Sequence, residues 1–598
     1  MSELKGRGGA WTEERGTSDE GRRRLKAPRK RAEDTAWAQD AVDAAGGLDV
    51  LLTDAALGVV RRLRPDSSML RLAAGLARRP RLVGRETARL GAELGRIVAG
   101  RSAITASPRD RRFSDPAWTG NAWLRRSVQA YLAAGQSAEE LLAGAELGWR
   151  DDTRLKFLLS NLVAAVAPSN SPLLSPAAWK ALIDTGGESA VRGVRALLSD
   201  LASPPRVPSM VPADAFEVGK DLAITPGGVV HASEQFELIQ YQPATESVYR
   251  YPLLIVPPMI NKFYLVDLAP GRSMVEFLVA QGHQVFVMSW RNPDARHRDW
   301  DLDTYGGAIV AALDAVRAIS GAGKANLLAL CSGGIATSMV AAHLSVAGRL
   351  GELASLCLGV AVLDQEQAGT AGAVIDEATA AAATAASATR GYLDGRALAE
   401  VFAWLRPDDL IWNYWVNNYL QGRPPPAFDI LYWNADTTRL PAALHRDFIK
   451  LGLANALTVP DQATMLGSPV DMSKVDVDAY VIAGVADHLC PWQSCYRTTQ
   501  MLGGQVKFVL STSGHIASMV NPPGNPKAAF QTGPDHSPNP ADPREFLAAA
   551  TTVPGSWWLD YSSWLGERSG GQKRSPGKLG AKAYPVQCAA PGTYVHDH

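Results

Sequence analysis

From residue 236 onward the chain predicts an α/β fold, because short apolar runs typical of strands alternate with helix-compatible stretches. Apolar runs bounded by polar or glycine-containing turns predict strands. They lie at residues 236–241, 251–256, 284–290, 326–330, 356–363, 479–484 and 506–510. This alternation indicates a largely parallel sheet, whose reactive groups lie in loops at the carboxyl ends of the strands. Three of these strand ends carry reactive side chains.

The first of the three is Cys331, which ends the apolar run 326–330. Ser332–Gly334 follow at once, and a helix-compatible stretch covers 335–344. A strand, a sharp turn of small residues and a helix form the nucleophile elbow of the α/β-hydrolase fold, here with cysteine in place of serine. An acyl group on a cysteine is itself a thioester and stays activated toward a hydroxyl. The elbow therefore favours acyl transfer from a thioester donor over ordinary fat hydrolysis.

Two later strand ends supply the partners that a nucleophile needs. The run 479–484 leads to Asp487, and the run 506–510 leads to a polar loop that presents His515. Alone, Cys331 would be read as a small buried hydrophobe, the acid as a turn cap and the base as an ordinary loop histidine. Together they follow the nucleophile, acid, base order of the α/β-hydrolase topology. His488 is a rival base, but beside Asp487 on the same loop it is poorly placed to be oriented by that acid, so we interpret it as structural.

Composition narrows the classes of function. The 598 residues hold 60 basic and 60 acidic side chains, so the net charge gives no support for nucleic acid as the main partner. Five dispersed cysteines do not form a disulfide framework and fit a reducing cytoplasm. No signal segment opens the chain and no apolar run reaches membrane-spanning length, so no membrane span is expected.

Length and local pattern predict two domains and a tail. Residues 1–40 are polar and carry the basic cluster Arg22–Arg31, which is typical of a disordered tail or, alternatively, of a segment that adheres to an anionic surface. Residues 41–235 predict a helical domain, and 236–598 the catalytic domain. An aromatic-rich insertion at about 365–445 is expected to form a lid that excludes water and shapes an acyl pocket. Its aromatic residues would equally suit a dimer face or plain core.

Two motifs that resemble cofactor sites are incomplete. Gly321–Lys324 resembles a phosphate loop, but the upstream glycine is missing and Ala325 replaces the serine or threonine. Cys490 and Cys495 have no neighbouring zinc ligands in the sequence. We therefore expect neither a metal nor a bound cofactor.

From about Arg111 to the C-terminus the chain closely resembles the polyhydroxyalkanoate synthases. The motifs that carry the resemblance are Pro257–Tyr264, Asp267–Leu268, Ser289–Pro293, Cys331–Gly334, Leu405–Trp415, Phe428–Asn434, Asp487–His488, Gly514–Ile516, Asn521–Pro523 and Ala590–Val595. Further stretches are most similar to the medium-chain-length (class II) branch: Trp415–Tyr419, Asp436–Pro441, Ser575–Gly580 and Ala583–Pro585. One departure is Ala329, where the family usually has glycine two residues before the nucleophile.

The resemblance implies an acyltransferase that polymerises (R)-3-hydroxyacyl-CoA into polyester and releases CoA, its thioester substrate. His515 would take the proton of Cys331, whose thiolate attacks the thioester, and would then act as general base for the hydroxyl of the growing chain. Backbone N–H groups of Ser332 and Met259 would hold the oxyanion. Asp487 would orient His515 or help to activate the hydroxyl. The resemblance also implies a homodimer at polyester granules in the cytoplasm.

Two other functions fit parts of the same pattern. A thioesterase or esterase of the α/β-hydrolase fold would differ only in releasing the acyl group to water, and free acid would be its product. A non-catalytic scaffold protein of a storage granule would be inert toward thioesters. The long aromatic insertion argues against the first and the intact set Cys331, Asp487 and His515 against the second.

Overall fold

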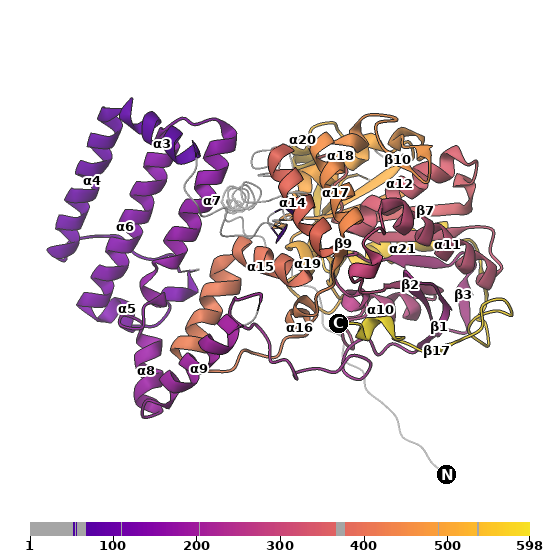
Figure 1. Ribbon diagram of the computed structural model, residues 1–598, viewed down its shortest axis with the longest axis horizontal. Helices are drawn as coiled ribbons and strands as arrows, with labels where there is room; N and C mark the ends of the chain where they lie inside the picture. The colour runs from indigo at the N-terminus through magenta and orange to yellow at the C-terminus, as the bar shows by residue number, and fades with distance from the viewer. Residues whose placement is uncertain are drawn as a thin grey trace, which may run out of the picture.

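The computed structural model describes residues 52–53, 55–56, 67–108, 110–202, 204–365, 377–487, 489–534 and 538–598. A helical region and an α/β region form two lobes, with the helices of an insertion between them (Figure 1). The predicted α/β fold with a helical N-terminal region is confirmed. The expected basic tail lies outside the described residues.

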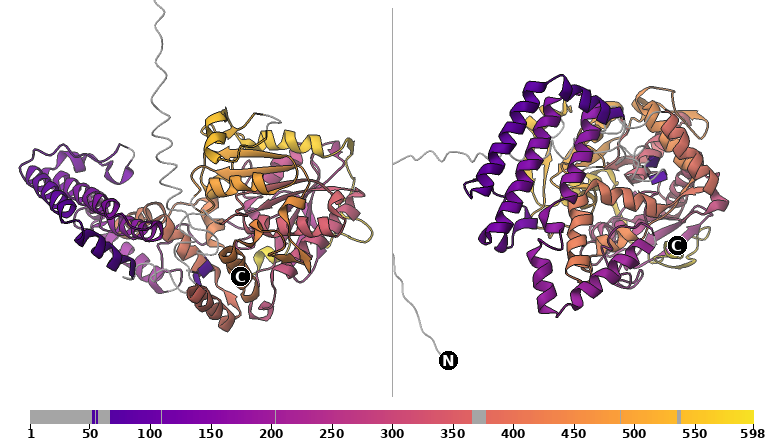
Figure 2. Two further views of the ribbon diagram at one scale, coloured as in Figure 1. Left: turned by 90° about the horizontal axis from the view of Figure 1, so that it is seen from above. Right: turned by 60° about the vertical axis from the view of Figure 1, so that its left-hand side comes forward.

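The helical lobe precedes the sheet and extends away from it (Figure 2). Its helices begin at caps where the sequence provides them: Asn121 accepts the backbone N–H groups of Trp123 and Leu124 at the start of α6. The helices of this lobe are α3 (Ser67–Ala77), α4 (Pro80–Val98), α5 (Ala117–Gly120), α6 (Ala122–Gly144), α7 (Trp149–Ala165), α8 (Pro176–Asp184) and α9 (Glu188–Ala202).

The α/β lobe is built on an eleven-stranded sheet in the order β15-β14-β13-β12-β7-β6-β4-β5-β2-β1-β17. Its central strands β13, β12, β7, β6, β4 and β5 are parallel, and the strands at both margins are antiparallel. The strands are β1 (Gly227–Ala232), β2 (Phe236–Tyr241), β4 (Leu253–Val256), β5 (Val285–Trp290), β6 (Ala325–Leu330), β7 (Leu353–Gly359), β12 (Ala479–Gly484), β13 (Val506–Ser511), β14 (Ala529–Thr532), β15 (Thr551–Pro554) and β17 (Cys588–Ala589).

Helices cover both faces of this sheet. Right-handed crossovers place α10 (Met274–Ala280) on one face and α11 (Leu302–Ser320) with α12 (Ser332–Val346) on the other, because the chain reverses its direction across the sheet at β5. On the α10 face, Phe277 contacts Trp558 of α21 (Trp557–Arg568) with ring centroids 5.6 Å apart. The other described α-helices of this lobe outside the insertion are α18 (Trp492–Met501), α19 (His515–Met519) and α20 (Pro543–Ala549).

Strand β2 differs from its sequence pattern in an informative way. The alternation in 236–241 predicts a half-buried strand, yet all six residues are buried. The C-terminal segment contacts polar side chains on both faces of the strand: the Glu237 carboxylate accepts hydrogen bonds from the backbone of Thr593 and Tyr594, and the Gln240 side chain accepts one from Gly580. The sheet also begins before the expected boundary at residue 236, because β1 pairs with β2.

The insertion between β7 and β12 is largely helical. It contains α14 (Glu377–Arg390), α15 (Gly395–Leu405), α16 (Asp429–Ala435), α17 (Ala442–Ala454) and two π-helical segments, η7 (Asp408–Trp412) and η8 (Trp415–Leu420). Short strand pairs complete the fold: β3 (Ser247–Tyr249) with β16 (Gln572–Arg574), β8 (Tyr392–Leu393) with β9 (Leu440–Pro441), and β10 (Thr464–Met465) with β11 (Ser468–Pro469). None of the described helices is long and apolar enough to cross a membrane.

The helical lobe is held to the insertion through α9 and η8. The Tyr419 hydroxyl donates to the Asp200 carboxylate at 2.7 Å, and the Asn418 amide donates to the Ser209 carbonyl at 2.7 Å. At Gly193 the two backbones approach so closely that a Cβ would overlap the Tyr419 carbonyl group. A glycine is therefore needed at this crossing.

Candidate active site

The loop after β6 forms a tight elbow at Cys331, as the sequence predicts. Cys331 has φ 49° and ψ −121°, a conformation that non-glycine residues seldom adopt. Its N–H donates to the Gly359 carbonyl at 2.9 Å. A Cβ at Gly333 would lie 2.5 Å from the Pro257 carbonyl oxygen, and one at Gly334 would lie 2.7 Å from the Ala361 Cβ. The two glycines thus allow the elbow to pack against the neighbouring strand ends.

The acid and the base come together at the ends of two adjacent strands. Asp487 follows β12, and His515 begins α19 after β13. The His515 Nδ1 lies 2.7 Å from Asp487 Oδ2, and both side chains are buried. Asp487 Oδ1 accepts the backbone N–H groups of Leu489 and Cys490 at 2.8 and 2.9 Å. Because both oxygens of the carboxylate are engaged, the acid is held in one orientation toward His515.

Cys331 lies beside His515 and beside a second thiol, Cys490. The ligand atoms of these three side chains all lie within 4.8 Å of one another. A hydrogen bond from Cys490 is the largest influence on the pKa of Cys331, and with the contribution of His515 it outweighs burial and lowers that pKa to about 5. Burial tends to lower the pKa of His515, but Asp487 and Cys331 outweigh it and raise it to about 10. The pair is therefore a thiolate and an imidazolium at neutral pH.

Sequence reasoning missed Cys490. Its thiol has a pKa well above the usual value, mainly because of the adjacent Cys331 and burial, so it keeps its proton and can donate it in a hydrogen bond. The sequence carried one signal for it: Cys490 lies three residues after the predicted acid, in the same loop. Cys495 lies close by in α18, and its Sγ is 3.9 Å from the Cys490 carbonyl oxygen. The rival base His488 lies outside the described residues.

The two predicted oxyanion donors lie on either side of the elbow. The backbone N–H of Ser332, the first residue of α12, donates toward the Cys331 sulfur. The backbone N–H of Met259, in the loop after β4, donates to the Ser332 Oγ at 3.0 Å. Met259 would therefore have to exchange this hydroxyl for an oxyanion before it could serve as a donor. Ala329 is completely buried in β6, where its methyl group is accommodated.

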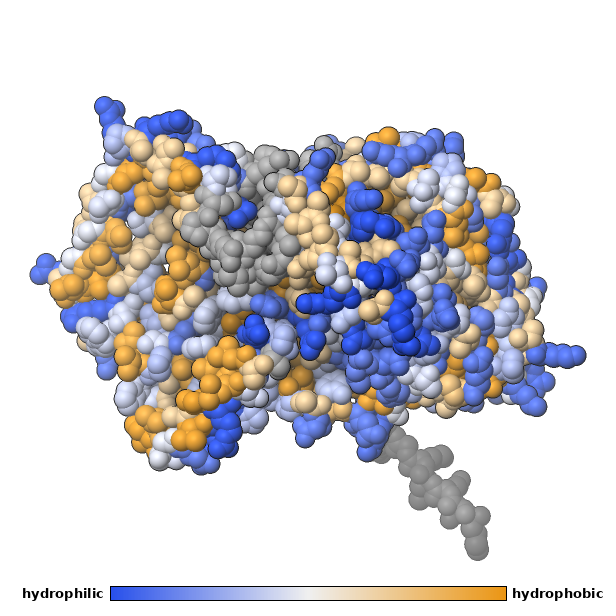
Figure 3. Space-filling view, viewed as in Figure 1, coloured by the Kyte–Doolittle hydropathy of each residue, from blue (hydrophilic) through white to orange (hydrophobic). Residues whose placement is uncertain are grey.

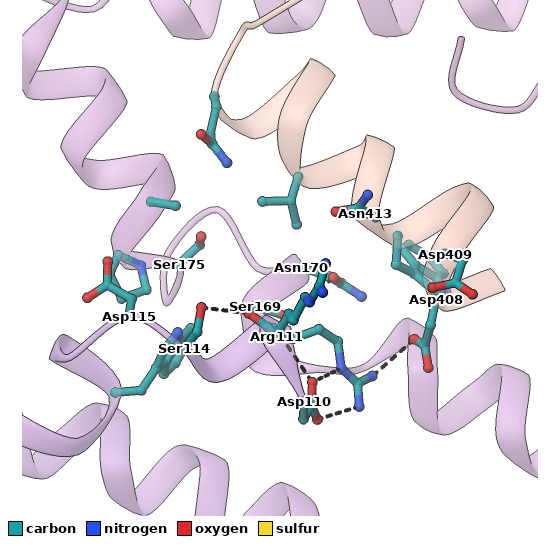
Figure 4. A pocket seen from close by; sticks show the side chains of 17 residues that line it. Asp110, Arg111, Ser114, Asp115, Ser169, Asn170, Ser175, Asp408, Asp409 and Asn413 are labelled. Atoms are coloured by element: carbon teal, nitrogen blue, oxygen red, sulfur yellow. Dashed lines mark hydrogen bonds and ion pairs between the residues drawn. The ribbon is translucent and has the colours of Figure 1, made fainter. Parts of the chain in front are cut away.

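Two cavities lie near the insertion, and the smaller is lined by Ile335, one helical turn after Cys331. A cavity of about 10 Å³ lies between α12 and α17 and has largely apolar walls, which include Ile335, Val362 and Phe448. A polar cavity of about 800 Å³ lies between the helical lobe and η7 (Figure 4). Arg112 crosses its edge and bonds Asp110 and Asp408. None of the three predicted catalytic side chains lines either cavity.

Comparison with known proteins agrees with the geometry. The family described as "Poly-beta-hydroxybutyrate polymerase (PhaC) N-terminus" matches residues 109–278, and the "alpha/beta hydrolase fold" family matches residues 253–522. Among solved structures, an esterase from Exiguobacterium antarcticum matches 48% of this chain and 92% of its own, at 14% identity and a TM-score of 0.30. A likeness at that level carries no weight for function.

Curated relatives match almost the whole chain. "Poly(3-hydroxyalkanoate) polymerase 1" of Ectopseudomonas oleovorans is 46% identical over 87% of this chain and 92% of its own. "Poly(3-hydroxyalkanoate) polymerase 2" of the same organism is 47% identical over 85% and 90%. The "Poly(3-hydroxyalkanoate) polymerase subunit PhaC" of Cupriavidus necator is 38% identical over 83% and 85%. These matches confirm the predicted resemblance to the polyhydroxyalkanoate synthases. The chain therefore belongs to the poly(3-hydroxyalkanoate) polymerases, a family of acyltransferases.

Proposed function

We propose that this protein polymerises (R)-3-hydroxyacyl-CoA into polyester through an acyl group carried on Cys331. The observation that carries the proposal is the contact of the Cys331 thiol with His515, whose other ring nitrogen lies 2.7 Å from Asp487. This contact lies at the elbow, and the chain is 46% identical to a named polymerase. A thiolate with a pKa of about 5 is a ready nucleophile at neutral pH.

The first step loads the enzyme. The Cys331 thiolate attacks the thioester carbonyl, and the bond from that carbon to the CoA sulfur breaks. The His515 imidazolium gives its proton to the departing CoA thiolate and becomes neutral. Ser332 and Met259 would donate their backbone N–H groups to the oxyanion that forms in between. The acyl group now rests on Cys331 as a thioester.

The second step extends the polymer. Neutral His515 takes the proton from the hydroxyl of the growing chain, and that oxygen attacks the acyl-cysteine carbonyl. The bond to the Cys331 sulfur breaks, which restores the thiolate and the imidazolium. Asp487 is engaged through both oxygens, with His515 on one of them. This arrangement supports an orienting role for Asp487 and leaves little of its carboxylate for a hydroxyl.

The surroundings of the elbow suit an aliphatic substrate. Apolar side chains of α12, α17 and the segment after β7 line the cavity of about 10 Å³, and we propose that they move apart to receive the acyl tail of a medium-chain monomer. They are Ile335, Val362, Leu363, Phe448 and Leu451. We propose a homodimer, as the family resemblance implies, and a place at polyester granules in the cytoplasm.

An exposed apolar stripe on α9 supports contact with a polyester surface. Four of its side chains, spaced at helical intervals on one face, are 52–63% exposed: Val191, Val194, Leu198 and Leu201. The space-filling view shows apolar surface gathered over this part of the helical lobe (Figure 3). An exposed apolar face of this kind is typical of a surface that binds another apolar phase.

Release of CoA from (R)-3-hydroxyoctanoyl-CoA by the purified protein tests the proposal. Wild-type protein should release CoA and convert the acyl group to polymer. Cys331→Ala should lose activity by at least about 1,000-fold, because the neighbouring Cys490 thiol keeps its proton and is a poor substitute for the Cys331 thiolate. The matched control is Cys588→Ala, which removes a partly exposed thiol in β17 and should leave turnover unchanged.

The form of the product decides between the alternatives. Free 3-hydroxyoctanoate in place of polymer would identify a thioesterase. Absence of CoA release with hydroxyacyl-CoA substrates of every chain length would favour the scaffold. Near wild-type turnover by Cys331→Ala would refute the assignment of the nucleophile.

A further inference from the structure

Three metal-ligating side chains converge at the elbow from separate parts of the chain. Cys331, Cys490 and His515 offer two sulfur atoms and one ring nitrogen, all within 4.8 Å of one another. Among the described residues, no other group of three or more histidine, cysteine or acidic side chains lies as close together. Zn–S bonds of about 2.3 Å and Zn–N bonds of about 2.0 Å place tetrahedral ligand atoms somewhat less than 4 Å apart. Small movements of these side chains would therefore close them around one ion.

The surroundings of His515 resemble those of a zinc-bound histidine. A ligating histidine usually donates its second N–H to a carboxylate, which fixes the ring and its tautomer. Here Nδ1 lies 2.7 Å from Asp487 Oδ2, and this leaves Nε2 for a metal. The other oxygen of Asp487 accepts the backbone N–H of Cys490 at 2.9 Å. One carboxylate thus orients the imidazole and holds the loop that carries the second thiol.

Burial supplies an enclosed site with one open side. Cys490 and His515 are buried, whereas Cys331 is partly exposed. Three protein ligands with an open fourth position, two of them thiolates and one an imidazole, form a known type of zinc site. Thiolates and imidazole also select soft or borderline ions over Mg²⁺ and Ca²⁺.

We propose that Cys331, Cys490 and His515 form an inhibitory site for Zn²⁺ and related thiophilic ions. A bound ion would occupy the sulfur of the nucleophile and the nitrogen of the base, so the metal and the acyl-CoA substrate exclude one another. The site itself follows from the geometry of the resting protein, and only its inhibitory effect rests on the proposed function. Cys490 then supplies the third ligand, beside the nucleophile and its base.

Titration of the reduced, metal-free full-length protein with Cd²⁺ tests the site without any assay of activity. The ultraviolet thiolate-to-cadmium absorption should reach its end point at one ion per chain, with an intensity that corresponds to two thiolates. Zn²⁺ should abolish that absorption by displacing Cd²⁺. Cys490→Ser should halve the absorption and weaken binding at least about tenfold. Cys490→Ala is a second variant that avoids a new buried hydroxyl.

The control is Cys495→Ser, which changes a buried thiol close to the site that is not one of the three proposed ligands. It should bind Cd²⁺ like the wild type. Activity measurements then follow: Zn²⁺ should inhibit CoA release competitively with acyl-CoA, and a chelator should restore it. Unchanged binding by both Cys490 variants, or an absorption that corresponds to one thiolate in the wild type, would overturn the proposal. Failure of the proposed function would appear instead as an active Cys331→Ala protein, and would leave the titration unaffected.

Discussion

At the scale of single residues, the reactivity of Cys331 depends on a neighbour that takes no part in the proposed acyl transfer. The Cys490 thiol and the His515 imidazolium both stabilise the Cys331 thiolate. Burial alone would raise the pKa of a cysteine, as it does for Cys357 in the adjacent strand β7. The two thiols differ in their partners: the Tyr561 hydroxyl does not outweigh the burial of Cys357, whereas Cys490 and His515 together favour the anion of the partly exposed Cys331.

The pH dependence of Cys331 alkylation should reveal the lowered pKa of this thiol. A thiolate forms above its pKa, so the rate with iodoacetamide should rise with pH and reach half its maximum near pH 5 in the wild type. Cys490→Val removes the largest stabilising contact and should move the midpoint to higher pH. Mass spectrometry of the peptide that contains Cys331 gives the rate.

Cys495→Ser serves as the control for this profile and should keep the wild-type midpoint. A wild-type midpoint near about 8.5, the value of an ordinary thiol, would contradict the thiolate assignment. An unchanged midpoint in Cys490→Val would remove Cys490 from the explanation.

The residues that the sequence could place are those whose position follows from topology. Cys331, Asp487 and His515 each end a strand, and the parallel order of β6, β12 and β13 brings such ends to one edge. The approach of Cys490 to Cys331 depends on how the loop after Asp487 folds back. The bond from Met259 to the Ser332 hydroxyl depends on a contact between two loops. Neither contact leaves a repeating pattern in the sequence.

At the scale of elements, the crossing of α9 and η8 joins the helical lobe to the insertion. Gly193 gives η8 the space to approach, and the hydrogen bonds of Asp200 and Ser209 with Tyr419 and Asn418 fasten the two. Without the close packing at Gly193 and these hydrogen bonds, only the exposed surfaces of the helices would touch. Such a contact would hold the two lobes together more weakly. The crossing therefore determines how the helical lobe is held against the insertion.

Gly193→Ala should loosen this crossing. The added methyl group would overlap the Tyr419 carbonyl, and overpacking of this kind costs about 1–3 kcal/mol. Limited proteolysis between the lobes should become faster, and the midpoint of urea unfolding should fall. Gly91→Ala in α4 is the matched control, because a Cβ there meets no atom within 4 Å. It should stabilise the helix by about 0.5–1 kcal/mol; equal behaviour of the two variants would contradict the packing argument.

The elements that could be predicted are those with strong local patterns. The strands β2, β5 and β6 lie within one residue of the ranges their apolar runs predict. The sequence does not predict β15 and β17, because both are short and largely exposed or half-buried, and β17 also depends on pairing with β1, which is distant in the sequence. The π-helical segments η7 and η8 likewise have no distinctive residue spacing, since their hydrogen bonds depend on packing in the insertion.

At the scale of the whole molecule, the C-terminal segment completes the core of the sheet. Glu237 in β2 is 3% exposed, and its carboxylate accepts the N–H groups of Thr593 and Tyr594 at 2.9 and 3.0 Å and the Thr593 hydroxyl at 2.6 Å. Lys262, 2% exposed, donates to the carbonyl oxygens of Tyr594 and Asp597. The buried side chains of Glu237 and Lys262 thus both find hydrogen-bond partners in the C-terminal segment.

Glu237→Gln should weaken the hydrogen bonds between β2 and the C-terminal segment. The amide can accept at one oxygen only, and its NH₂ group would face backbone donors, so we expect a loss of about 1.5–3 kcal/mol in the free energy of unfolding. Urea denaturation measures the loss, and faster release of residues near the C-terminus by carboxypeptidase would show that the segment detaches. Glu234→Gln makes the same change of charge at an exposed position nearby and should stay within about 0.5 kcal/mol of the wild type. A similar effect of both variants would show that the buried hydrogen bonds contribute nothing.

The position of this segment also affects the order in which the protein can mature during synthesis. Glu237 and Lys262 leave the ribosome more than three hundred residues before Thr593 and Tyr594, which satisfy them. Until those late residues emerge, the Glu237 carboxylate in β2 lacks these hydrogen-bond donors, and β1 has an open edge that β17 will later close. The sheet that positions Cys331 is therefore completed only near the end of translation, when β17 and Thr593 have emerged.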